Sequence, residues 1–375
     1  MKRKKQNIGL VTSPIAEGNK NQLSNLVTIL RSISNDIYFI TGNAGCTLFK
    51  ENKEIHTYGI QYQLGSNAFT KIIRHFYMQL RISYKLIKIA GNVDLWIFFV
   101  GSDTLSLPIL TLKILRKNVV LVLPGYSSIG FKLTNDRLYV PVKILETINR
   151  TLSNHIILYS PNLIKEWNLE QYRNKFSIAH EHFLDFDKFK MKKKFGERDN
   201  LVGYIGRLSE EKGILNFVKA IPEISKEKDD LEFLIGGDGQ LCDNIKKHLD
   251  ENNLNDKVNL AGWIPHDKLP DYLNELKLVV LPSYTEGLPN LMLEAMACGT
   301  PVLATPVGAI PDVITDGETG FIMEANSPAC IAENVMRALE HPDLERIVEN
   351  ARALVEREFT YEAAVERYRG ILDDL

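Results

Sequence analysis

Short apolar runs rich in β-branched residues alternate with helical patterns along the whole chain. This alternation is typical of a parallel β-sheet that carries helices on both faces. A length of 375 residues suggests two such domains. We expect strands at residues 8–12, 95–100, 119–123, 156–158, 201–205, 231–235, 258–262, 278–282 and 301–305. We expect helices at residues 22–32, 105–115, 213–226, 240–252, 266–276 and 290–298, and helical structure from residue 327 onward. The predicted fold class is therefore α/β with two Rossmann-like domains.

A charged segment divides this pattern into two halves. Residues 191–200, MKKKFGERDN, contain a glycine and no apolar period, so we predict that they link the domains. The domains would then span residues 1–190 and 201–359, followed by a final helix at residues 360–375. In open α/β sheets, ligands bind at the carboxyl ends of the strands. Functional residues are therefore expected in the loops that directly follow strands.

The net charge of −2 hides a strong asymmetry between the two halves. Residues 1–190 contain 25 Lys and Arg against 13 Asp and Glu, whereas residues 191–375 contain 20 against 34. Such asymmetry suggests that the first half meets an anionic partner, although unequal surface charge is the simpler alternative. The sequence has no aromatic-basic platform typical of nucleic-acid binding, so we do not expect nucleic acid as a partner.

Residues 70–92 have a basic amphipathic pattern. Its cations are Lys71, Arg74, Arg81, Lys85 and Lys88. They interleave with the apolar residues Ile72, Phe76, Tyr77, Leu80, Leu86 and Ile87. A helix of this kind can lie on an anionic membrane leaflet. In the alternative interpretation, its apolar face packs against the sheet like that of any amphipathic helix.

The sequence predicts no membrane-spanning segment. Asp103 and Pro108 interrupt the most apolar region, and the basic start of the chain resembles a first strand more than a secretory signal. The cysteines, which are Cys46, Cys242, Cys298 and Cys330, form no C-x-x-C pair, so no structural metal is expected. We therefore expect a cytoplasmic protein, placed at the inner face of the cell membrane if residues 70–92 bind lipid.

The stretch GRLSEEKG, Gly206 to Gly213, directly follows a predicted strand. Arg207 and Lys212 lie in its loop, beside the start of the next helix. Two cations at a helix N-terminus make an anion site, because free N–H groups and the helix dipole add to their charge. A guanidinium and an ammonium group together suit a diphosphate. The alternative is a surface salt bridge with Glu210 or Glu211.

Two further loops follow strands of the second half, LIGGDG at 234–239 and LAGWIP at 260–265. Gly237 would let the backbone approach a ligand closely, although a tight turn explains this glycine equally well. The backbone of the second loop could bond to the edge of a nucleobase, with Trp263 or Ile264 as an apolar wall. The alternative for Trp263 is an aromatic residue that packs in the core.

Two carboxylates with seven residues between them stand in the stretch EGLPNLMLE, Glu286 to Glu294. Pro289 and Asn290 suit the start of a helix whose faces are nearly all apolar, so this helix should be buried. A buried Glu294 needs a partner. The partner could be a pair of ribose hydroxyls. Alternatively, Glu294 could belong to a buried structural ion pair. Glu286 precedes the helix and could accept hydrogen bonds from sugar hydroxyls, close to free N–H groups of Gly287 to Leu291.

This set of motifs resembles the retaining nucleotide-sugar glycosyltransferases of family 4. The resemblance rests on E-x7-E in EGLPNLMLE, on the following AMACGTPVLATPVGAIPDVI and on the upstream GRLSEEKG. It implies a GT-B fold, in which two Rossmann-like domains face each other across a cleft and the last helix crosses back to the first domain. It also implies a nucleotide diphosphate sugar, UDP- or GDP-linked, as donor substrate, with no cofactor and no metal.

The resemblance assigns roles to individual positions. Arg207 and Lys212 would hold the diphosphate in place of a metal ion, Glu286 the donor sugar, and Glu294 the ribose. The catalytic set would be Arg207, Lys212 and Glu286. The remaining donor-binding residues would be Gly206, Gly237, Trp263, Ile264, Gly287, Leu288, Pro289, Asn290 and Leu291.

The first half departs from the family pattern. The loop after the first strand offers only Gly18 where the family has a glycine pair, and Tyr126 follows the strand where a histidine is common. These two residues are the candidates for the acceptor side. His180 and His182 could line the acceptor site. Together with Glu181 they offer few ligands for a metal ion. The DFD stretch at 185–187 also matches the D-x-D form of metal-dependent transferases of another fold.

The resemblance implies a hexosyl-type glycosyltransferase that retains anomeric configuration and needs no metal. Its acceptor would be a sugar, glycan or lipid-linked hydroxyl in the synthesis of cell-surface glycans, polysaccharides or glycolipids. Three alternatives remain open, namely a sugar-nucleotide epimerase, a glycoside hydrolase and a non-catalytic GT-B scaffold or binding subunit.

Overall fold

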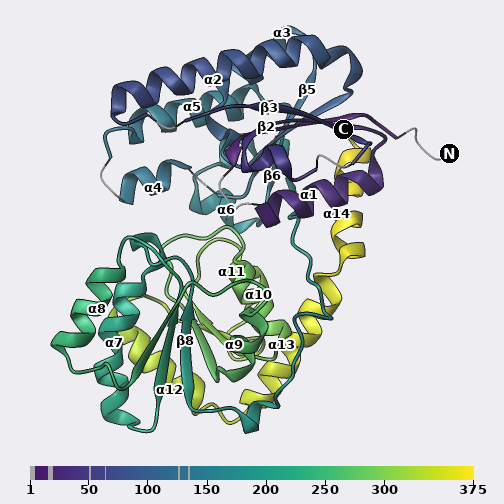
Figure 1. The fold of residues 1–375 in the computed structure, drawn as a ribbon. Coiled ribbons are helices and arrows are strands. Elements are labelled where there is room, and N and C mark those ends of the chain that lie inside the picture. Colours follow the sequence, from purple (N-terminus) through teal and green to yellow (C-terminus); the bar gives the residue numbers. More distant parts are fainter. Residues whose placement is uncertain (1–4, 16–19, 50–51, 64, 126, 134–135) are drawn as a thin grey trace. The chain divides into compact units, whose positions relative to one another are not determined.

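The computed structural model describes residues 5–15, 20–49, 52–63, 65–125, 127–133 and 136–375. The chain divides into two compact units (Figure 1). The first unit comprises residues 1–183 together with 361–375, and the second comprises residues 184–360. The division therefore falls at residue 183, ahead of the predicted boundary at 190, and the C-terminal segment belongs to the first unit.

The first unit is built on a parallel sheet. In the described residues, its strands are β1 (Ile8–Ile15), β2 (Ile37–Asn43), β3 (Ile55–Ile60), β4 (Leu95–Phe99), β5 (Asn118–Leu123), β6 (His155–Leu158) and β7 (Phe176–Ile178). Their spatial order is β3-β2-β1-β4-β5-β6-β7. Every residue of β4 is buried, as expected at the centre of a sheet that is covered on both faces.

Helices cover both faces of this sheet. They are α1 (Lys20–Ile33), α2 (Ala68–Ile89), α3 (Ser106–Ile114), α4 (Ser127–Leu133), α5 (Tyr139–Leu152), α6 (Asn162–Glu166) and α14 (Tyr361–Asp373). Figure 1 shows α2, α3 and α5 on one face and α1 and α14 on the other. A capping box starts α2, because Asn67 Oδ1 accepts from the Thr70 N–H while Thr70 Oγ1 accepts from the Asn67 N–H.

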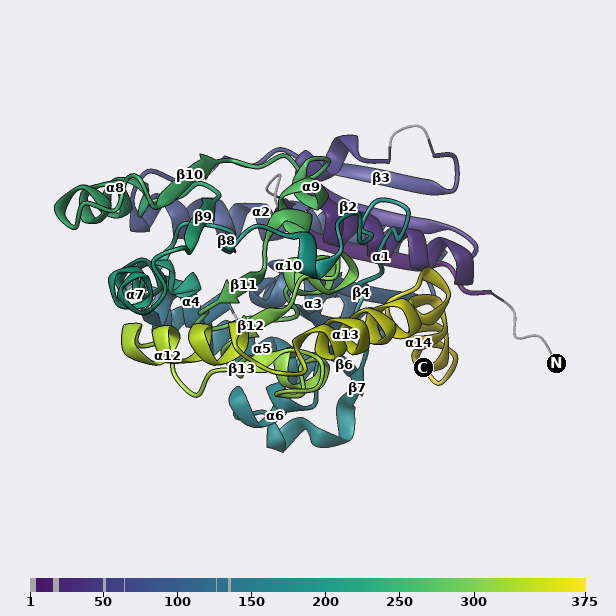
Figure 2. The same cartoon turned by 90° about the horizontal axis from the view of Figure 1, so that it is seen from below.

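Helix α14 completes the first unit. It packs beside α1, as Figures 1 and 2 both show. Its buried side chains are Ala364, Val365, Tyr368 and Leu372. These residues follow the three- and four-residue spacing of an amphipathic helix, so one stripe of α14 faces the interior.

The second unit contains a separate parallel sheet. Among the described residues its strands are β8 (Leu201–Ile205), β9 (Glu232–Gly236), β10 (Val258–Gly262), β11 (Leu278–Leu281), β12 (Val302–Ala304) and β13 (Phe321–Ile322), in the order β10-β9-β8-β11-β12-β13. Its helices are α7 (Ile214–Glu227), α8 (Cys242–Glu251), α9 (Leu269–Glu275), α10 (Asn290–Ala297), α11 (Ile310–Val313), α12 (Pro328–Leu339) and α13 (Leu344–Glu358). The α/β class and the two Rossmann-like sheets predicted from the sequence are confirmed.

Residues 191–200, predicted to link the domains, pack on the second unit. The buried Arg198 guanidinium donates to Thr300 Oγ1 at 2.7 Å and to the Cys298 and Leu276 carbonyls at 2.7 and 2.9 Å. Burial lowers the pKa of Arg198 to about 10. This segment is therefore fastened to the C-terminal ends of α9 and α10 rather than left as a free connection.

In the part of the chain that the structure describes, none of the helices combines the length and the apolar character needed to cross a bilayer.

Candidate functional site

In the sheet of the second unit, the order in which the chain adds strands reverses between β8 and β11. From β8 the chain proceeds through β9 and β10 to one edge, and from β11 it proceeds through β12 and β13 to the other. Both strands are parallel neighbours, so the loops at their carboxyl ends lie next to each other. Such a switch point is where open α/β sheets bind ligands. The predicted motifs at Gly206–Gly213 and Glu286–Glu294 are these two loops.

An ion pair joins the two loops. Lys212 Nζ lies 2.7 Å from Glu286 Oε1, and Ser283 Oγ donates to the same carboxylate oxygen at 2.7 Å. The side chain of Glu286 is only 9% exposed and that of Lys212 is 28% exposed. Lys212 comes from the 3-10 turn Glu210–Lys212 directly before α7. The structure therefore places two of the three predicted catalytic residues in direct contact.

Gly213 makes this contact possible. Its φ of +66° is in the left-handed region, and a Cβ at this position would lie 1.9 Å from the Pro282 carbonyl oxygen. Only glycine allows the start of α7 to approach the end of β11 this closely. The backbone approach at Gly213 therefore brings the neighbouring Lys212 to Glu286.

Arg207 lies at the surface of the same loop. Its guanidinium is 68% exposed and lies 3.4 Å from Glu211 Oε1, which is one of the surface pairs considered from the sequence. An exposed pair of this kind holds a side chain only weakly. The backbone of Arg207 is fixed, because Tyr204 Oη donates to the Arg207 carbonyl at 2.7 Å. Burial, and then the negative charge of Glu286, raise the pKa of Tyr204, which stays a neutral donor.

Two predicted glycines meet at the ends of β8 and β9. The Gly206 N–H donates to the Gly236 carbonyl at 2.9 Å, and the Gly237 N–H donates to the Gly262 carbonyl at 2.6 Å. Gly237 has a φ of +130°, and a Cβ there would lie 1.8 Å from the Gly206 carbonyl oxygen. The backbone contact between Gly206 and Gly237 thus explains the second glycine without a ligand.

Trp263 and Ile264 follow β10 and differ in exposure. Trp263 is 74% exposed, so it is not the packed aromatic that the sequence also allowed. Ile264 is 8% exposed, with its Cδ1 close to Gly236. Trp263 is therefore available to a flat ligand, whereas Ile264 is part of the wall behind it.

The first turn of α10 has no side-chain cap. Pro289 is the N-cap of α10 and, like any proline, has no side-chain acceptor for the first-turn N–H groups. Leu288 is buried at 5% exposure, and the Gly287 carbonyl accepts from the Ala309 N–H at 2.7 Å, so the loop is held in place. The N–H groups at Asn290 and Leu291 begin the helix, where an anion is favoured.

Glu294 is buried on α10 and has a protein partner. Its Oε1 lies 2.8 Å from His266 Nε2, and Lys188 Nζ lies 2.9 Å from His266 Nδ1. An ammonium group only donates, so Nδ1 accepts, and in the neutral ring Nε2 carries the hydrogen that is donated to Glu294. Glu294 therefore has a structural partner in the protein, in the form of a hydrogen bond from neutral His266 rather than an ion pair, and this bond occupies one carboxylate oxygen.

His266 is the residue that the sequence analysis missed. It lies in the stretch WIPHDKL that follows β10, at a strand end like the other candidates. Its position in such a loop was a signal that could have been used. Its partners, Lys188 and Glu294, lie 78 and 28 residues away along the chain, so spacing does not bring them together.

The remaining candidates lie in other segments of the chain. Gly18 and Tyr126, proposed for the acceptor side, lie outside the described residues. Asp185 of the DFD stretch accepts from the N–H groups of Asp187 and Lys188, which makes it a turn residue. His180 and His182 belong to the first unit, where both rings pack edge-on to Tyr159.

A family comparison covers the same part of the chain. Residues 185–354 match the family described as "Glycosyl transferases group 1". The second unit therefore contains a domain that is similar to this family. All the described candidates, from Gly206 to Glu294, lie within this domain. His266 and Lys188 lie within it as well.

Curated relatives match over part of their length. The chain is 31% identical to alpha-D-kanosaminyltransferase of Streptomyces kanamyceticus, over 53% of this chain and 53% of the relative. It is 30% identical to N-acetyl-alpha-D-glucosaminyl L-malate synthase of Bacillus anthracis, over 50% of each chain. The chain thus spans about half the length of these relatives.

The whole chain shares its fold with solved structures. The crystal structure of HepE from Anabaena, in complex with UDP and glucose, aligns with a TM-score of 0.76 at 17% identity. The alignment covers 99% of this chain and 100% of HepE. At this identity the likeness concerns the fold alone, and the fold is GT-B.

Proposed function

We propose that this protein is a retaining glycosyltransferase of family 4. It transfers a hexosyl-type sugar from a nucleotide diphosphate sugar to an acceptor hydroxyl without a metal ion. The observation that carries this proposal is the pairing of Lys212 with Glu286 at the switch point of a group 1 domain. The names of the curated relatives, which are transferases and synthases of sugar conjugates, support it.

The diphosphate of the donor would lie beside Lys212 and Arg207. Lys212 is a cation at the start of α7, and the exposed Arg207 guanidinium can turn toward the same anion. The amide donors at the start of α10 would bind the donor from the other loop. Together these groups stabilise the negative charge that develops on the leaving diphosphate, which is the work that a metal ion does elsewhere.

The two carboxylates would hold the sugar and the nucleoside. Glu286, fixed by Ser283, would accept hydrogen bonds from hydroxyls of the transferred sugar. The Glu294 carboxylate only accepts hydrogen bonds, and one of its oxygens accepts from His266. Its other oxygen would accept hydrogen bonds from ribose hydroxyls. Trp263 would cover the base. The complex of HepE with UDP supports a uridine donor, with guanosine as the second candidate.

The reaction would proceed on one face of the sugar. The bond from the anomeric carbon to the phosphate oxygen breaks, and its electron pair stays on that oxygen. The acceptor oxygen bonds to the anomeric carbon, and its proton passes to the leaving phosphate. The transition state resembles an oxocarbenium ion. The acceptor would be a sugar, glycan or lipid-linked hydroxyl in cell-surface glycan, polysaccharide or glycolipid synthesis.

Thermal stabilisation tests the donor site directly. The full chain is measured with UDP, GDP, ADP and their hexose conjugates, with magnesium and with EDTA. A ligand at about 100 times its Kd stabilises a protein by about 2.7 kcal/mol. We expect a shift with one nucleotide series in both conditions and a much smaller shift for Lys212→Ala. Lys219→Ala, on the exposed side of α7, is the matched control and should behave as wild type.

Turnover tests the reaction. Release of the nucleotide together with a product that carries the sugar on an acceptor would distinguish transfer from epimerisation and from simple binding. The absence of any nucleotide-dependent stabilisation, or a shift that requires magnesium, would contradict the proposed donor site. An isolated glycosyl-enzyme adduct would contradict same-face attack.

A further inference from the structure

Helix α2 presents three different stripes along its length. The buried stripe, which packs in the first unit, consists of Met78, Ile82, Leu86 and Ile89. A second apolar stripe is 45–72% exposed and consists of Phe69, Ile73, Phe76, Leu80, Tyr84 and Ile87. Its spacing of three or four residues places it on one side of the helix. The helix therefore packs against its own unit through one apolar stripe and leaves another apolar stripe open.

The third stripe of α2 is basic. It consists of Arg74, Arg81, Lys85 and Lys88, again at helical spacing. On a helical wheel this stripe lies between the exposed apolar stripe and the buried one. The basic residues thus border the exposed apolar stripe along one of its sides.

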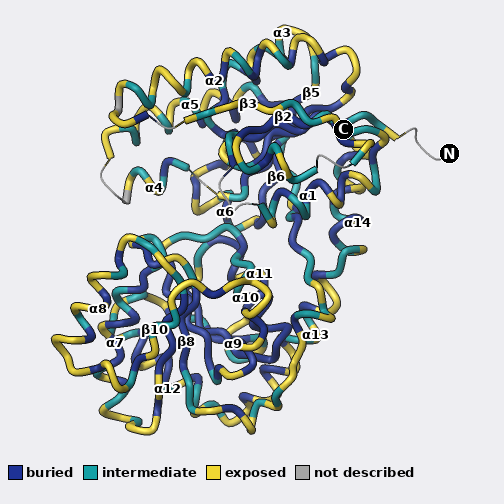
Figure 3. Tube along the Cα trace, viewed as in Figure 1, coloured by how far each residue is buried: buried dark blue, intermediate teal, exposed yellow. Residues whose placement is uncertain are grey.

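Two neighbouring helices extend the exposed apolar surface. α2 packs beside α3, and α3 packs beside α5, in the layer that Figure 1 shows on one face of the sheet. Exposed apolar residues on or next to these two helices are Leu110, Ile114, Leu115, Val140, Ile144 and Ile148. Figure 3 shows exposed positions along all three helices. An apolar surface of this extent marks an interaction site. We call it the outer helical face.

The charges of the outer helical face have one sign. The sequences of α2 and α3 contain no acidic residue, and the acidic residue of α5, Glu146, is only 1% exposed. Lys71, Lys113 and Lys143 add to the four cations of the basic stripe. The charge and the apolar character together complement an anionic surface with an apolar interior, which describes a membrane leaflet of anionic lipid.

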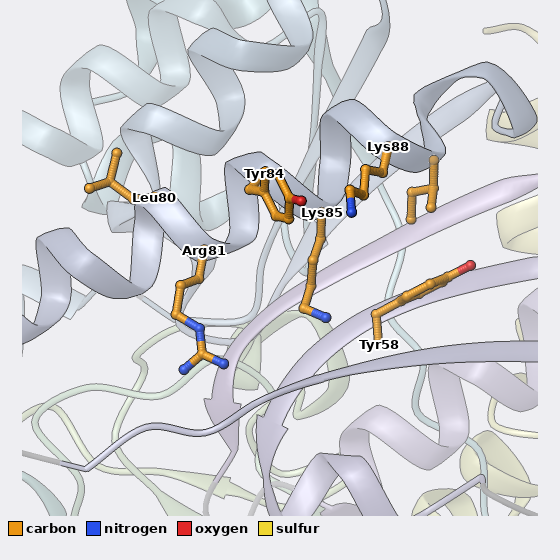
Figure 4. Close-up of a pocket in the computed structure, with 7 residues that line it drawn as sticks. Tyr58, Leu80, Arg81, Tyr84, Lys85 and Lys88 are labelled. Atoms are coloured by element: carbon orange, nitrogen blue, oxygen red, sulfur yellow. The ribbon is translucent and has the colours of Figure 1, made fainter.

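A pocket of about 470 Å³ lies between α2 and β3 (Figure 4). It is lined by the cations Arg81, Lys85 and Lys88, by the rings of Tyr58 and Tyr84, and by the apolar side chains of Leu80 and Ile89. Lys88 Nζ lies 4.4 Å from the centroid of the Tyr84 ring, and Lys85 Nζ lies 5.9 Å from that of Tyr58. Tyr84 also belongs to the exposed apolar stripe. A phosphate head group in this pocket would therefore sit beside the stripe that acyl chains would cover.

We propose that the outer helical face docks on an anionic membrane surface and that the pocket between α2 and β3 binds a lipid phosphate head group. The apolar stripe of α2 enters the interfacial region, and Arg81, Lys85 and Lys88 contact the head groups. The surface lies in the first unit and does not depend on the donor site of the second.

Vesicle flotation of the full chain tests this inference. Vesicles of phosphatidylcholine alone are compared with vesicles that also contain phosphatidylglycerol. We expect flotation only with the anionic vesicles. Phe76→Gln/Ile87→Gln removes two exposed apolar side chains, and Lys85→Gln/Lys88→Gln removes two cations of the pocket. Each surface cation contributes about 1 kcal/mol, or about fivefold, to binding an anionic leaflet. The charge variant should therefore bind at least about tenfold more weakly.

The controls separate this surface from other causes. Lys246→Gln/Lys247→Gln removes two exposed cations from α8 of the second unit and should float as wild type. All substituted side chains are at least partly exposed, so the thermal midpoint of each variant should stay close to that of wild type. The nucleotide-dependent shift, measured on the same preparations, reports separately on the donor site.

Three outcomes would overturn the inference. The first is wild-type protein that floats with neither kind of vesicle. The second is an equal loss of binding in the α8 control. The third is self-association in light scattering that Phe76→Gln/Ile87→Gln abolishes while no vesicle binding is found, because the face would then belong to a second copy of the chain.

Discussion

Lys212 and Glu286 are each other's partner across the switch point of the second unit, with 2.7 Å between Nζ and Oε1. The two residues are 74 positions apart and come from the loops after β8 and β11. A diphosphate that binds Lys212 would compete with Glu286 for this cation. The carboxylate is then left with Ser283 as donor and gains the sugar hydroxyls as further partners. Donor binding would thus exchange one set of partners for another.

Loss of the cation should affect both binding and stability. In the proposed reaction Lys212 stabilises the leaving diphosphate, so we expect kcat/KM to fall by about 10²–10³ in Lys212→Ala. It also leaves the nearly buried Glu286 carboxylate with one fewer donor, at a cost of about 1–3 kcal/mol. Glu286→Gln should cost less stability, because the charge that loses its partner, on Lys212, is 28% exposed, whereas the Glu286 side chain is only 9% exposed. Urea unfolding of both variants measures the difference, and an equally stable Lys212→Ala would contradict the buried pair.

His266 should act through Glu294. His266→Ala removes the donor that orients the Glu294 carboxylate, so we expect the Kd of the nucleotide to rise by about tenfold, in the range seen for orienting partners. His266→Gln, which keeps a donor, should recover part of the loss. Calorimetric titration with the nucleotide checks this, with His248→Ala on α8 as a control. Unchanged affinity in His266→Ala would show that Glu294 holds its position alone.

Glu181 should make the first unit less stable as pH rises. Tyr159 Oη donates to Glu181 at 2.5–2.6 Å, and burial raises the pKa of Glu181 to about 7 from 4.5. The folded state therefore binds its proton more tightly than the unfolded state. The stabilisation is complete below about pH 4.5 and is lost as pH rises through about 7, with a total on the order of 3 kcal/mol.

Glu181→Gln removes this titration and should flatten the pH dependence. Unfolding is followed by the fluorescence of Trp96 and Trp167, which are buried in the first unit. The difference in stability between the variant and wild type should grow from about pH 5 to about pH 8. Glu170→Gln, at an exposed position, should keep the wild-type slope. Parallel curves for wild type and Glu181→Gln would contradict the assignment.

Gly213 should tolerate no side chain. Gly213→Ala places a Cβ against the Pro282 carbonyl at a φ of +66°, so we expect a loss of about 2 kcal/mol or more and a weakened donor site. Gly370→Ala is the contrasting substitution, because no atom lies within 4 Å of its added Cβ in α14. It should stabilise the protein by about 0.4–1 kcal/mol. Thermal unfolding of the two variants checks the expected loss of stability in Gly213→Ala and the expected gain in Gly370→Ala.

The alternation of apolar runs and helical patterns was enough to predict the two sheets. It was not enough for β2 and β3, which the sequence analysis did not name. β3 is an edge strand, buried only at Ile55 and Ile60, so its four central residues carry no apolar run. Edge strands of this kind lack the continuous apolar signal of a central strand such as β4.

The loops of the site could be located from the sequence, but their contacts could not. Sequence spacing left Arg207 and Lys212 with nearby glutamates as possible partners, and the structure bears this out for Arg207 only. Lys212 instead pairs with Glu286, because β8 and β11 are neighbours in the sheet. Sheet order is a long-range property that local periodicity does not contain. The same holds for the contact of Glu294 with His266.

The return of the chain to its first unit has a consequence for biosynthesis. Helix α14 is made after the whole second unit, and it covers α1, which lies near the beginning of the chain. During translation, residues 184–360 are therefore complete before residues 20–33 gain their contact with α14. The unit that is synthesised first is the one that is completed last.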